Sequence, residues 1–162
     1  MGKIHQFFMT STSNYEVRPA SLRDAKAIAE IDAHATQGHW REAIEFCEPQ
    51  VYVAVHHGQI VGFVGFDRSR DKGTPPTTGE IWNIKVNAAH WGKGCGLALW
   101  DAAREGLLEE GCTSVTLWLP TSNERALRFH ELAGFKREMN SIKTVPAGSV
   151  RIEIIRLRRA LN

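Results

Sequence analysis

The sequence predicts a mixed α/β fold, and three observations indicate it. The chain has 162 residues, 43% of them hydrophobic, which suits one globular domain with a sizeable core. Segments rich in β-branched and aromatic residues alternate with segments of helical apolar periodicity. An antiparallel hairpin precedes the middle of the chain, unlike a regular doubly wound fold, in which helices alternate with parallel strands throughout. We expect a flexible leader at residues 1–14 and a single domain over 15–160.

The first half of the chain shows helix signals near its start and a hairpin after them. Ser21 is a predicted N-cap, and Asp24 lies near the positive end of the helix that follows. The predicted elements are a strand at Tyr15–Arg18, a helix from Leu22 to Ala33, a loop at Gln37–Trp40, a short helix at Arg41–Cys47 and hairpin strands at Val51–Val55 and Ile60–Phe66.

The second half begins with a segment that opposes regular structure. Charged residues, Gly73 and the Pro75–Pro76 pair predict a mobile loop over Arg68–Gly79. Thr121 and Glu124 have the spacing of a capping box. The predicted elements are a strand at Glu80–Val86, a helix at Gly96–Glu110 ended by Gly111, a strand at Ser114–Leu119, a helix from Thr121 to Ala133 ended by Gly134, and strands at Phe135–Ile142 and Ser149–Leu157.

Composition and charge exclude several classes of protein. The net charge is only +2 and the basic residues are dispersed, so we expect no nucleic-acid partner. No apolar run approaches the roughly 18 residues of a membrane span, so we expect no membrane partner. The three cysteines lack the paired spacing of a zinc site or a redox motif, and the His56–His57 pair has no matched ligands nearby. We therefore expect no metal and a cytoplasmic protein with reduced thiols.

A glycine-rich run between a predicted strand and a predicted helix is the strongest functional signal. Glycines at 92, 94 and 96 expose backbone N–H groups to a ligand that approaches closely, most often a phosphate. A Walker A loop would need Ser or Thr after Gly92–Lys93, where this chain has Gly94. The run also lacks the upstream glycine that a Walker A loop requires. A dinucleotide fingerprint fails because Leu97 or Leu99 would occupy its last position.

The run Trp91–Gly92–Lys93–Gly94–Cys95–Gly96 resembles the acetyl-CoA loop, Arg/Gln-x-x-Gly-x-Gly/Ala, of the GNAT superfamily of acyltransferases. Trp91 replaces the usual Arg or Gln. The segment Asn123–Phe135 is similar to a second motif of the family, Asn-x-x-Ala-x-x-x-Tyr-x-x-x-Gly-Phe, with His130 in the place of Tyr. The opening Val17–Ala20 with Asp24 also resembles the family, so the likeness extends from about Tyr15 to Leu157.

This resemblance implies a GNAT-like acyl-CoA N-acyltransferase fold with a mixed, largely antiparallel central sheet of about six to seven strands and helices on both faces. It implies acetyl-CoA as co-substrate, with the strand before the loop splayed from the next strand, Ser114–Leu119, so that its backbone can pair with pantetheine. The cofactor contacts it implies are Ile84, Lys85, Val86, Trp91, Gly92, Lys93, Gly94, Cys95, Gly96, Leu97, Asn123, Ala126 and Phe129. The alternative role of Asn123 is to cap the helix. The alternative for Lys93 is a solvated side chain that contacts no phosphate.

Acetyl transfer from a thioester to an amine needs a neutral amine and protonation of the departing thiolate. Glu80 stands eleven residues before Trp91, which resembles the spacing of the general base in histone-type members, and its alternative is a solvated side chain. His130 occupies the position of the family's acidic Tyr, and its alternative is packing while solvent supplies the proton. A buried Cys95 is favoured over a nucleophile.

Trp40, Trp82 and Asn83 are candidates for binding the acceptor, with core packing as the alternative for both tryptophans. We expect a small-molecule primary amine as acceptor. A protein N-terminus or lysine is the nearest alternative, and a non-catalytic acyl-CoA-binding or sensor module is an alternative of another class. A homodimer in which the C-terminal strand extends the sheet between subunits is a further expectation left open.

Overall fold

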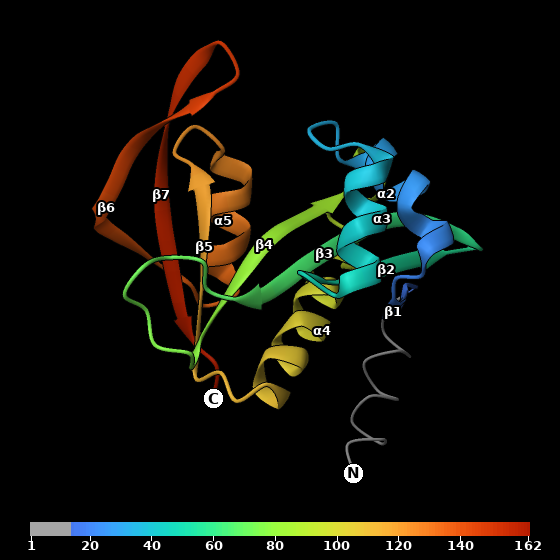
Figure 1. Ribbon diagram of the computed structural model, residues 1–162, viewed down its shortest axis with the longest axis horizontal. Helices are drawn as coiled ribbons and strands as arrows, with labels where there is room; N and C mark the ends of the chain where they lie inside the picture. The colour runs from blue at the N-terminus through green and yellow to red at the C-terminus, as the bar shows by residue number, and fades with distance from the viewer. Residues whose placement is uncertain (1–13) are drawn as a thin grey trace. The chain divides into compact units, whose positions relative to one another are not determined.

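The computed structural model describes residues 14–162, so the predicted leader lies outside the described residues except for Asn14. The elements run β1 (Glu16–Pro19), η1 (Leu22–Asp24), α2 (Ala25–Ile31), α3 (Gln37–Phe46), β2 (Gln50–His56), β3 (Gln59–Arg68), β4 (Thr78–Val86), η2 (Ala88–His90), α4 (Cys95–Glu109), β5 (Ser114–Pro120), α5 (Glu124–Leu132), β6 (Lys136–Ala147) and β7 (Val150–Ala160) (Figure 1). The strands form one seven-stranded sheet in the order β1-β2-β3-β4-β5-β7-β6. This mixed, mostly antiparallel sheet confirms the expected fold class.

The described chain divides into two compact units, each treated by itself below. Unit 1 comprises the described residues up to Asp67 together with Trp82–Gly106, and unit 2 comprises Arg68–Ile81 and Leu107–Asn162. Strand β4 contributes residues to both units. The expectation of a single domain stays a prediction.

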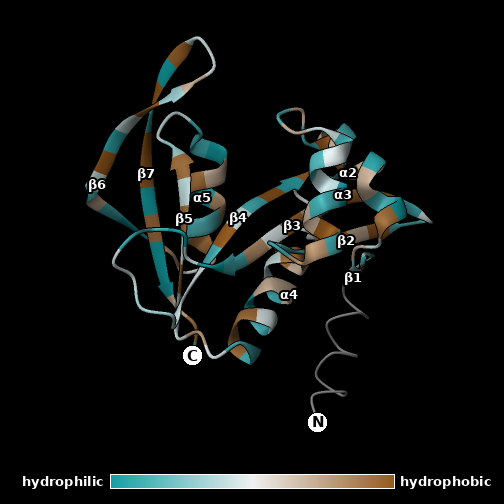
Figure 2. Cartoon of the chain, in the orientation of Figure 1, coloured by the Kyte–Doolittle hydropathy of each residue, from teal (hydrophilic) through white to brown (hydrophobic). Residues whose placement is uncertain are grey.

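Unit 1 has helices on both faces of its strands, because successive residues of β3 point to opposite sides. Phe63 packs on one side against Trp40 of α3, with ring centroids 4.9 Å apart. Its neighbour Gly62 faces the other side, where an added Cβ would lie 3.1 Å from Leu99 of α4. The core on the α3 side also contains Ala25, Ile28, Ala43, Val51 and Val53. The alternation of hydrophobic and hydrophilic residues along these elements is visible in Figure 2.

Unit 2 has one apolar and one polar sheet face. Along β5 and β7 the buried Val115, Leu117, Ile155 and Leu157 alternate with Thr116, Trp118, Arg156 and Arg158. Strand β4 pairs with β5 in parallel over three residues, Thr78–Glu80 opposite Ser114–Thr116. The later β4 residues 84–86 have no β5 partner in that register, as the resemblance implies for the strand that meets pantetheine.

Three local predictions are wrong. The stretch 37–40 is no loop but the first turn of α3, because the Thr36 side chain accepts a hydrogen bond from His39 N at 3.1 Å and caps the helix. Helix α5 is capped by Asn123 in place of Thr121, whose hydroxyl bonds to Glu153. The C-terminal strand β7 cannot extend the sheet to another subunit, because β5 and β6 already pair with its two edges.

Candidate functional site

The glycine-rich turn of unit 1 leads from β4 into the first turn of α4. Gly92 and Gly94 have φ values of 73° and 91°, and a Cβ added at either position would meet nothing within 4 Å. Helix α4 begins at Cys95, so the first N–H groups after Gly94 have no intrahelical carbonyl partner. The turn therefore offers open backbone and unpaired donors at the positive end of a helix, which is the arrangement that binds phosphate.

Trp91 and Cys95 flank this turn in different ways. The Trp91 indole is 48% exposed and its Nε1 donates to the carbonyl oxygen of Val86 at 2.8 Å, which ties the turn to the end of β4. The Cys95 side chain is buried, and burial raises the pKa of its thiol to about 11. A thiol with so high a pKa stays protonated at neutral pH and is a poor nucleophile.

The end of β4 is held from the α2 side of unit 1. Lys85 Nζ lies 3.2 Å from Oδ1 of the buried Asp32, which also accepts a hydrogen bond from His34 N. The Lys85 side chain is thus occupied, while its backbone groups belong to the part of β4 beyond the β5 pairing. A cofactor contact at Ile84, Lys85 or Val86 would be made by main-chain atoms, as predicted.

The three predicted acceptor residues have different surroundings in unit 1. Trp40 is 1% exposed, so it packs in the core, as the alternative to acceptor binding predicts. Its Nε1 has no hydrogen-bond partner among the described residues. Trp82 is half-buried. Asn83 lies against β3, since a Cβ on Gly65 would be 3.2 Å from Asn83 Oδ1. Their contacts with an acceptor stay predictions.

Helix α5 of unit 2 carries the predicted residues of the second motif. Asn123 Oδ1 accepts a hydrogen bond from Ala126 N at 3.2 Å, so its capping alternative is realised, and its amide NH₂ group remains a potential donor. Phe129 is half-buried and its ring meets the His130 ring edge to face at 5.0 Å. A hollow of about 530 Å³ along α5 is lined by none of the predicted site residues.

His130 is 3% exposed and has a defined tautomer. Its Nδ1 lies 2.8 Å from the carbonyl oxygen of Ala126, and because a carbonyl oxygen only accepts, Nδ1 carries the hydrogen. The ring also packs edge to face on Phe135. Burial lowers the pKa of His130 below its usual value, and the hydrogen bond to Ala126 opposes this only in part. The free nitrogen is therefore Nε2, and the ring is mostly neutral at pH 7.

Glu80 is buried in unit 2 and tied to Arg70. At 2% exposed it is no solvated residue, so that alternative reading is wrong. Arg70 donates to Glu80 three times: its backbone N and Nε to Oε1 at 2.9 and 3.3 Å, and Nη2 to Oε2 at 2.7 Å. A carboxylate has about four lone-pair sites. The one left by these contacts belongs to Oε2.

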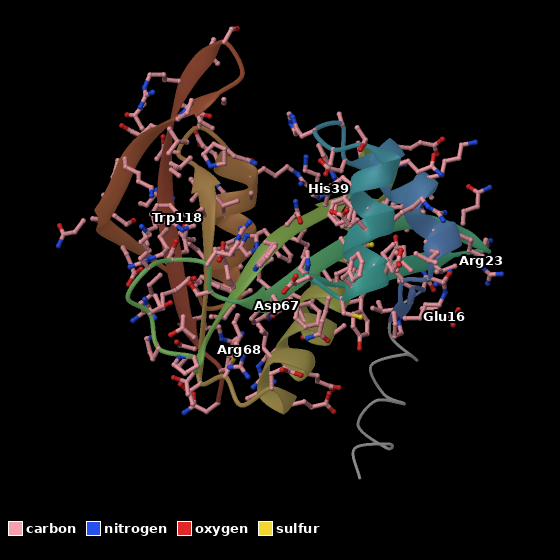
Figure 3. The ribbon with its side chains drawn as sticks, viewed as in Figure 1. Glu16, Arg23, His39, Asp67, Arg68 and Trp118 are labelled. Atoms are coloured by element: carbon pink, nitrogen blue, oxygen red, sulfur yellow. The ribbon has the colours of Figure 1, made fainter. Side chains whose placement is uncertain are left out.

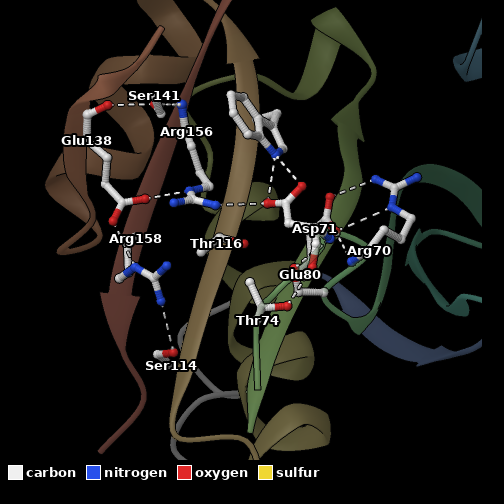
Figure 4. Close-up of polar contacts among 12 residues, drawn as sticks. Arg70, Asp71, Thr74, Glu80, Ser114, Thr116, Glu138, Ser141, Arg156 and Arg158 are labelled. Carbon is white, nitrogen blue, oxygen red and sulfur yellow. Dashed lines mark hydrogen bonds and ion pairs between the residues drawn. The ribbon is translucent and has the colours of Figure 1, made fainter. Parts of the chain in front are cut away.

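Sequence reasoning missed a polar network that begins at Asp71, the residue after Arg70 (Figure 4). The Trp118 indole, labelled on β5 in Figure 3, donates through Nε1 to both carboxylate oxygens of Asp71, at 3.1 and 3.2 Å. Asp71 also accepts from Arg156, and Glu138 accepts from Arg156 and Arg158. The predicted mobile loop is thus anchored at residues 70 and 71. The alternation of polar and apolar residues along 114–119 and 154–158 was the available signal.

Neither metal ligands nor a membrane helix was found in the part of the chain that the structure describes. Residues 14–162 contain no group of three or more His, Cys, Asp or Glu side chains able to hold a metal ion. None of the helices within those residues is long and apolar enough to cross a membrane. None of the three cysteines, all within the described range, forms a disulfide.

Comparison with known proteins decides the family. A family model for the acetyltransferase (GNAT) family matches residues 14–135. The chain belongs to the GNAT family. Curated relatives of this GNAT chain include mycothiol acetyltransferases. That of Propionibacterium freudenreichii is 32% identical over 94 residues, which cover 58% of this chain and 30% of the relative. That of Frankia alni is 32% identical over 127 residues, which cover 67% of this chain and 38% of the relative. The chain spans about a third of the length of the curated relatives it matches.

Solved structures show the same GNAT fold. The acetyltransferase yncA from Salmonella typhimurium, solved with its cofactor acetyl-CoA, has a TM-score of 0.76 at 20% identity and covers 93% of this chain and 95% of its own. An N-acetyltransferase from Staphylococcus aureus Mu50 has a TM-score of 0.77 at 22% identity, with 93% and 100% covered. At these identities the likeness shows the fold alone.

Proposed function

We propose that this GNAT protein transfers the acetyl group of acetyl-CoA directly to the primary amine of a small molecule. The observation that carries the proposal is the open turn at Gly92 and Gly94, where both glycines adopt positive φ directly before the N-terminus of α4. This turn fits the phosphates of acetyl-CoA, because a Cβ added at Gly92 or Gly94 would meet only open space, so a ligand can approach the backbone there. Curated relatives named after the small molecule mycothiol support a small acceptor over a protein.

In the proposed reaction the amine nitrogen bonds to the acetyl carbon, the bond between that carbon and sulfur breaks, and the amine loses a proton while the thiolate gains one. Glu80 accepts the amine proton, directly or through water, at the lone pair of Oε2 that Arg70 leaves unoccupied. Backbone and side-chain bonds to Arg70 fix the direction of that lone pair. Arg70 is therefore a positioning residue in this proposal.

His130 supplies the proton to the thiolate from Nε2 in its protonated form, since Nδ1–H is held by Ala126. Burial lowers the pKa of His130, so the protonated fraction at pH 7 falls below that of a free histidine. A nearby negative thiolate opposes this, because it favours the charged imidazolium. If His130 is the acid, turnover falls as the pH rises above its pKa.

Two further features are proposed with this activity. The backbone of 84–86, the turn 91–97 and the Asn123, Ala126 and Phe129 side of α5 contact the cofactor. Three cysteines that form no disulfide, Cys47, Cys95 and Cys112, support a reducing, cytoplasmic location.

Calorimetric titration with acetyl-CoA and release of free CoA thiol across a panel of amines test the proposal. Gly94→Asp should weaken acetyl-CoA binding at least about tenfold, because Asp is strained at positive φ and its charge repels phosphate. Gly111→Asp is the matched control: it lies just after the other end of α4, also with positive φ and open space, and should bind normally. Unchanged affinity in Gly94→Asp would refute the loop assignment.

The same assay separates the alternatives. Thiol release with protein N-termini or lysines but with no small amine would move the acceptor class to proteins. Tight acetyl-CoA binding without thiol release from any acceptor would contradict the enzyme and favour a binding or sensor module.

A further inference from the structure

Unit 2 carries three cross-strand rows of side chains on its polar sheet face, read from the strand register. The first row contains Glu80, Thr116, Arg158 and Lys136, because Glu80 pairs with Thr116, Thr116 with Arg158 and Arg158 with Lys136. The second row contains Trp118, Arg156 and Glu138. In the third row Lys143 stands opposite Ile154, whose partner on β5 is Pro120. Successive rows are two residues apart, about 7 Å along the strands.

Every arginine of this face is neutralised by a carboxylate. Arg70 bonds to Glu80 at 2.7 Å, and Arg158 bonds to Glu138 at 2.9 Å. Arg156 lies between two carboxylates, 2.5 Å from Glu138 and 3.1 Å from Asp71. These contacts occupy the guanidinium groups and leave them little capacity for a further anion.

Lys143 differs from these arginines, because no carboxylate among the described residues neutralises it. Its side chain is exposed and its Nζ stands 4.5 Å from the centroid of the Trp118 ring. No carboxylate within residues 14–162 forms a salt bridge with it. A cation over an aromatic face is stabilised by only about 0.5–1 kcal/mol at an exposed site and keeps its full charge. Lys143 is therefore a cation beside Trp118 that is available to an anion.

The Trp118 ring beneath Lys143 is itself held in place. Both carboxylate oxygens of Asp71 accept from its indole Nε1, and Arg156 Cζ stands 5.6 Å from the same ring. The indole is thereby fixed in orientation, and the Lys143 ammonium group reaches from the third row to lie above it. The residues of the second row, Trp118 among them, lie about 7 Å along the strands from the row that contains Glu80.

We propose that Lys143 over the Trp118 ring binds a carboxylate of the acceptor, so that the acceptor is a small amino acid. This inference rests on the proposed function, because it places the reacting amine at Glu80.

Paired acceptors test this inference through CoA thiol release. Each ω-amino acid from glycine to aminohexanoate is compared with its own carboxamide, which has the same amine and no carboxylate. We expect kcat/KM for at least one acid of the series to exceed that for its own amide by about tenfold, as for a charge-assisted contact.

Variants assign the preference to its residue. Lys143→Gln should remove the difference between acid and amide, and Lys143→Arg should keep it. Lys136→Gln is the matched control, because Lys136 is an exposed lysine of the same strand, and it should leave the preference unchanged. Equal use of acid and amide by the unaltered protein, or a preference that survives in Lys143→Gln, would overturn the inference.

A binding measurement separates this inference from the proposed function. N-acetyl-aminohexanoate and its amide are titrated calorimetrically into the protein with CoA present, which needs no turnover. Tighter binding of the acid than of the amide, lost in Lys143→Gln, supports the carboxylate site. This holds even if no amine gives thiol release, since that failure would contradict only the proposed enzyme activity. Equal binding together with thiol release would refute the site and leave the enzyme standing.

Discussion

At the scale of single residues, His130 links the stability of the protein to pH. Burial holds its pKa below that of the unfolded chain, so the unfolded state binds the proton more readily. We expect the free energy of unfolding to be highest above about pH 6.5, the ordinary histidine value, and to fall as the pH drops through that value toward the pKa of folded His130. Urea unfolding at a series of pH values measures this.

Two variants isolate the contribution of His130. His130→Phe should flatten the dependence below pH 6.5, whereas His34→Phe, at an exposed histidine, should leave it unchanged. A remaining slope of the same sign is expected from His90, whose pKa is lowered by desolvation and by the charges of His56 and Lys93. A slope in His130→Phe as steep as in the unaltered protein would contradict the assigned effect of burial.

Residue spacing alone could predict that Glu80 has a special place, but not what surrounds it. The carboxylate is buried with Arg70 as partner, and Arg70 belongs to a segment whose glycine and prolines predicted only a mobile loop. The surroundings of Trp40 could not be predicted from the sequence either, because a tryptophan is as consistent with a core side chain as with an acceptor contact. Burial depends on neighbours far along the chain, such as Phe63 for Trp40.

At the scale of elements, periodicity and turn residues predicted most strands and helices and missed two helix starts. The hairpin of β2 and β3 was read correctly because β-branched and aromatic residues flank a short glycine-containing turn. The start of α3 was missed because Gly38 and His39 are poor helix formers, and the Thr36 cap was not recognised. Thr121 and Asn123 are both residue types that cap helices well. In the structure the Thr121 hydroxyl bonds to Glu153, and Asn123 caps α5.

Helix α4 approaches β3 closely at a glycine, and this contact gives a prediction. A Cβ on Gly106 would lie 2.6 Å from the ring of Phe66, which is fully buried. Gly106→Ala should therefore lower the free energy of unfolding by about 1–3 kcal/mol through overpacking, partly offset by about 1 kcal/mol of helix propensity. Denaturant unfolding measures the net loss.

Gly38→Ala is the control for helix propensity alone. Gly38 lies in α3, and the nearest atom to an added Cβ is Thr36 Oγ1 at 3.8 Å, an ordinary contact. This variant should be up to about 1 kcal/mol more stable than the unaltered protein. A gain in Gly106→Ala equal to that in Gly38→Ala would show that α4 does not need this close approach.

At the scale of the whole molecule, local motifs predicted the family and the order of elements, whereas long-range pairing stayed hidden. The run 91–97 and the segment 123–135 are contiguous in sequence, so a reader can recognise them. The network of unit 2 joins Asp71 to Trp118 and to Arg156, residues 47 and 85 positions apart. Only the folded register brings such residues together, so the carboxylate site inferred at Lys143 could not be predicted from spacing.

The predicted cofactor contacts fall in both compact units, and hydrogen exchange tests each unit separately. A ligand that binds only the folded chain stabilises it by about 2.7 kcal/mol at a hundredfold excess over its Kd, and amides at its contacts gain further protection. With acetyl-CoA we expect slower exchange in peptides covering 91–97 of unit 1 and 123–129 of unit 2. The turn after β6, at Gly148, should exchange as before, because fraying there does not require global unfolding. Gly94→Asp should remove the protection of both segments together, because both are proposed contacts of the same cofactor. Protection confined to 91–97 would contradict the roles of Asn123, Ala126 and Phe129 while leaving the phosphate turn intact.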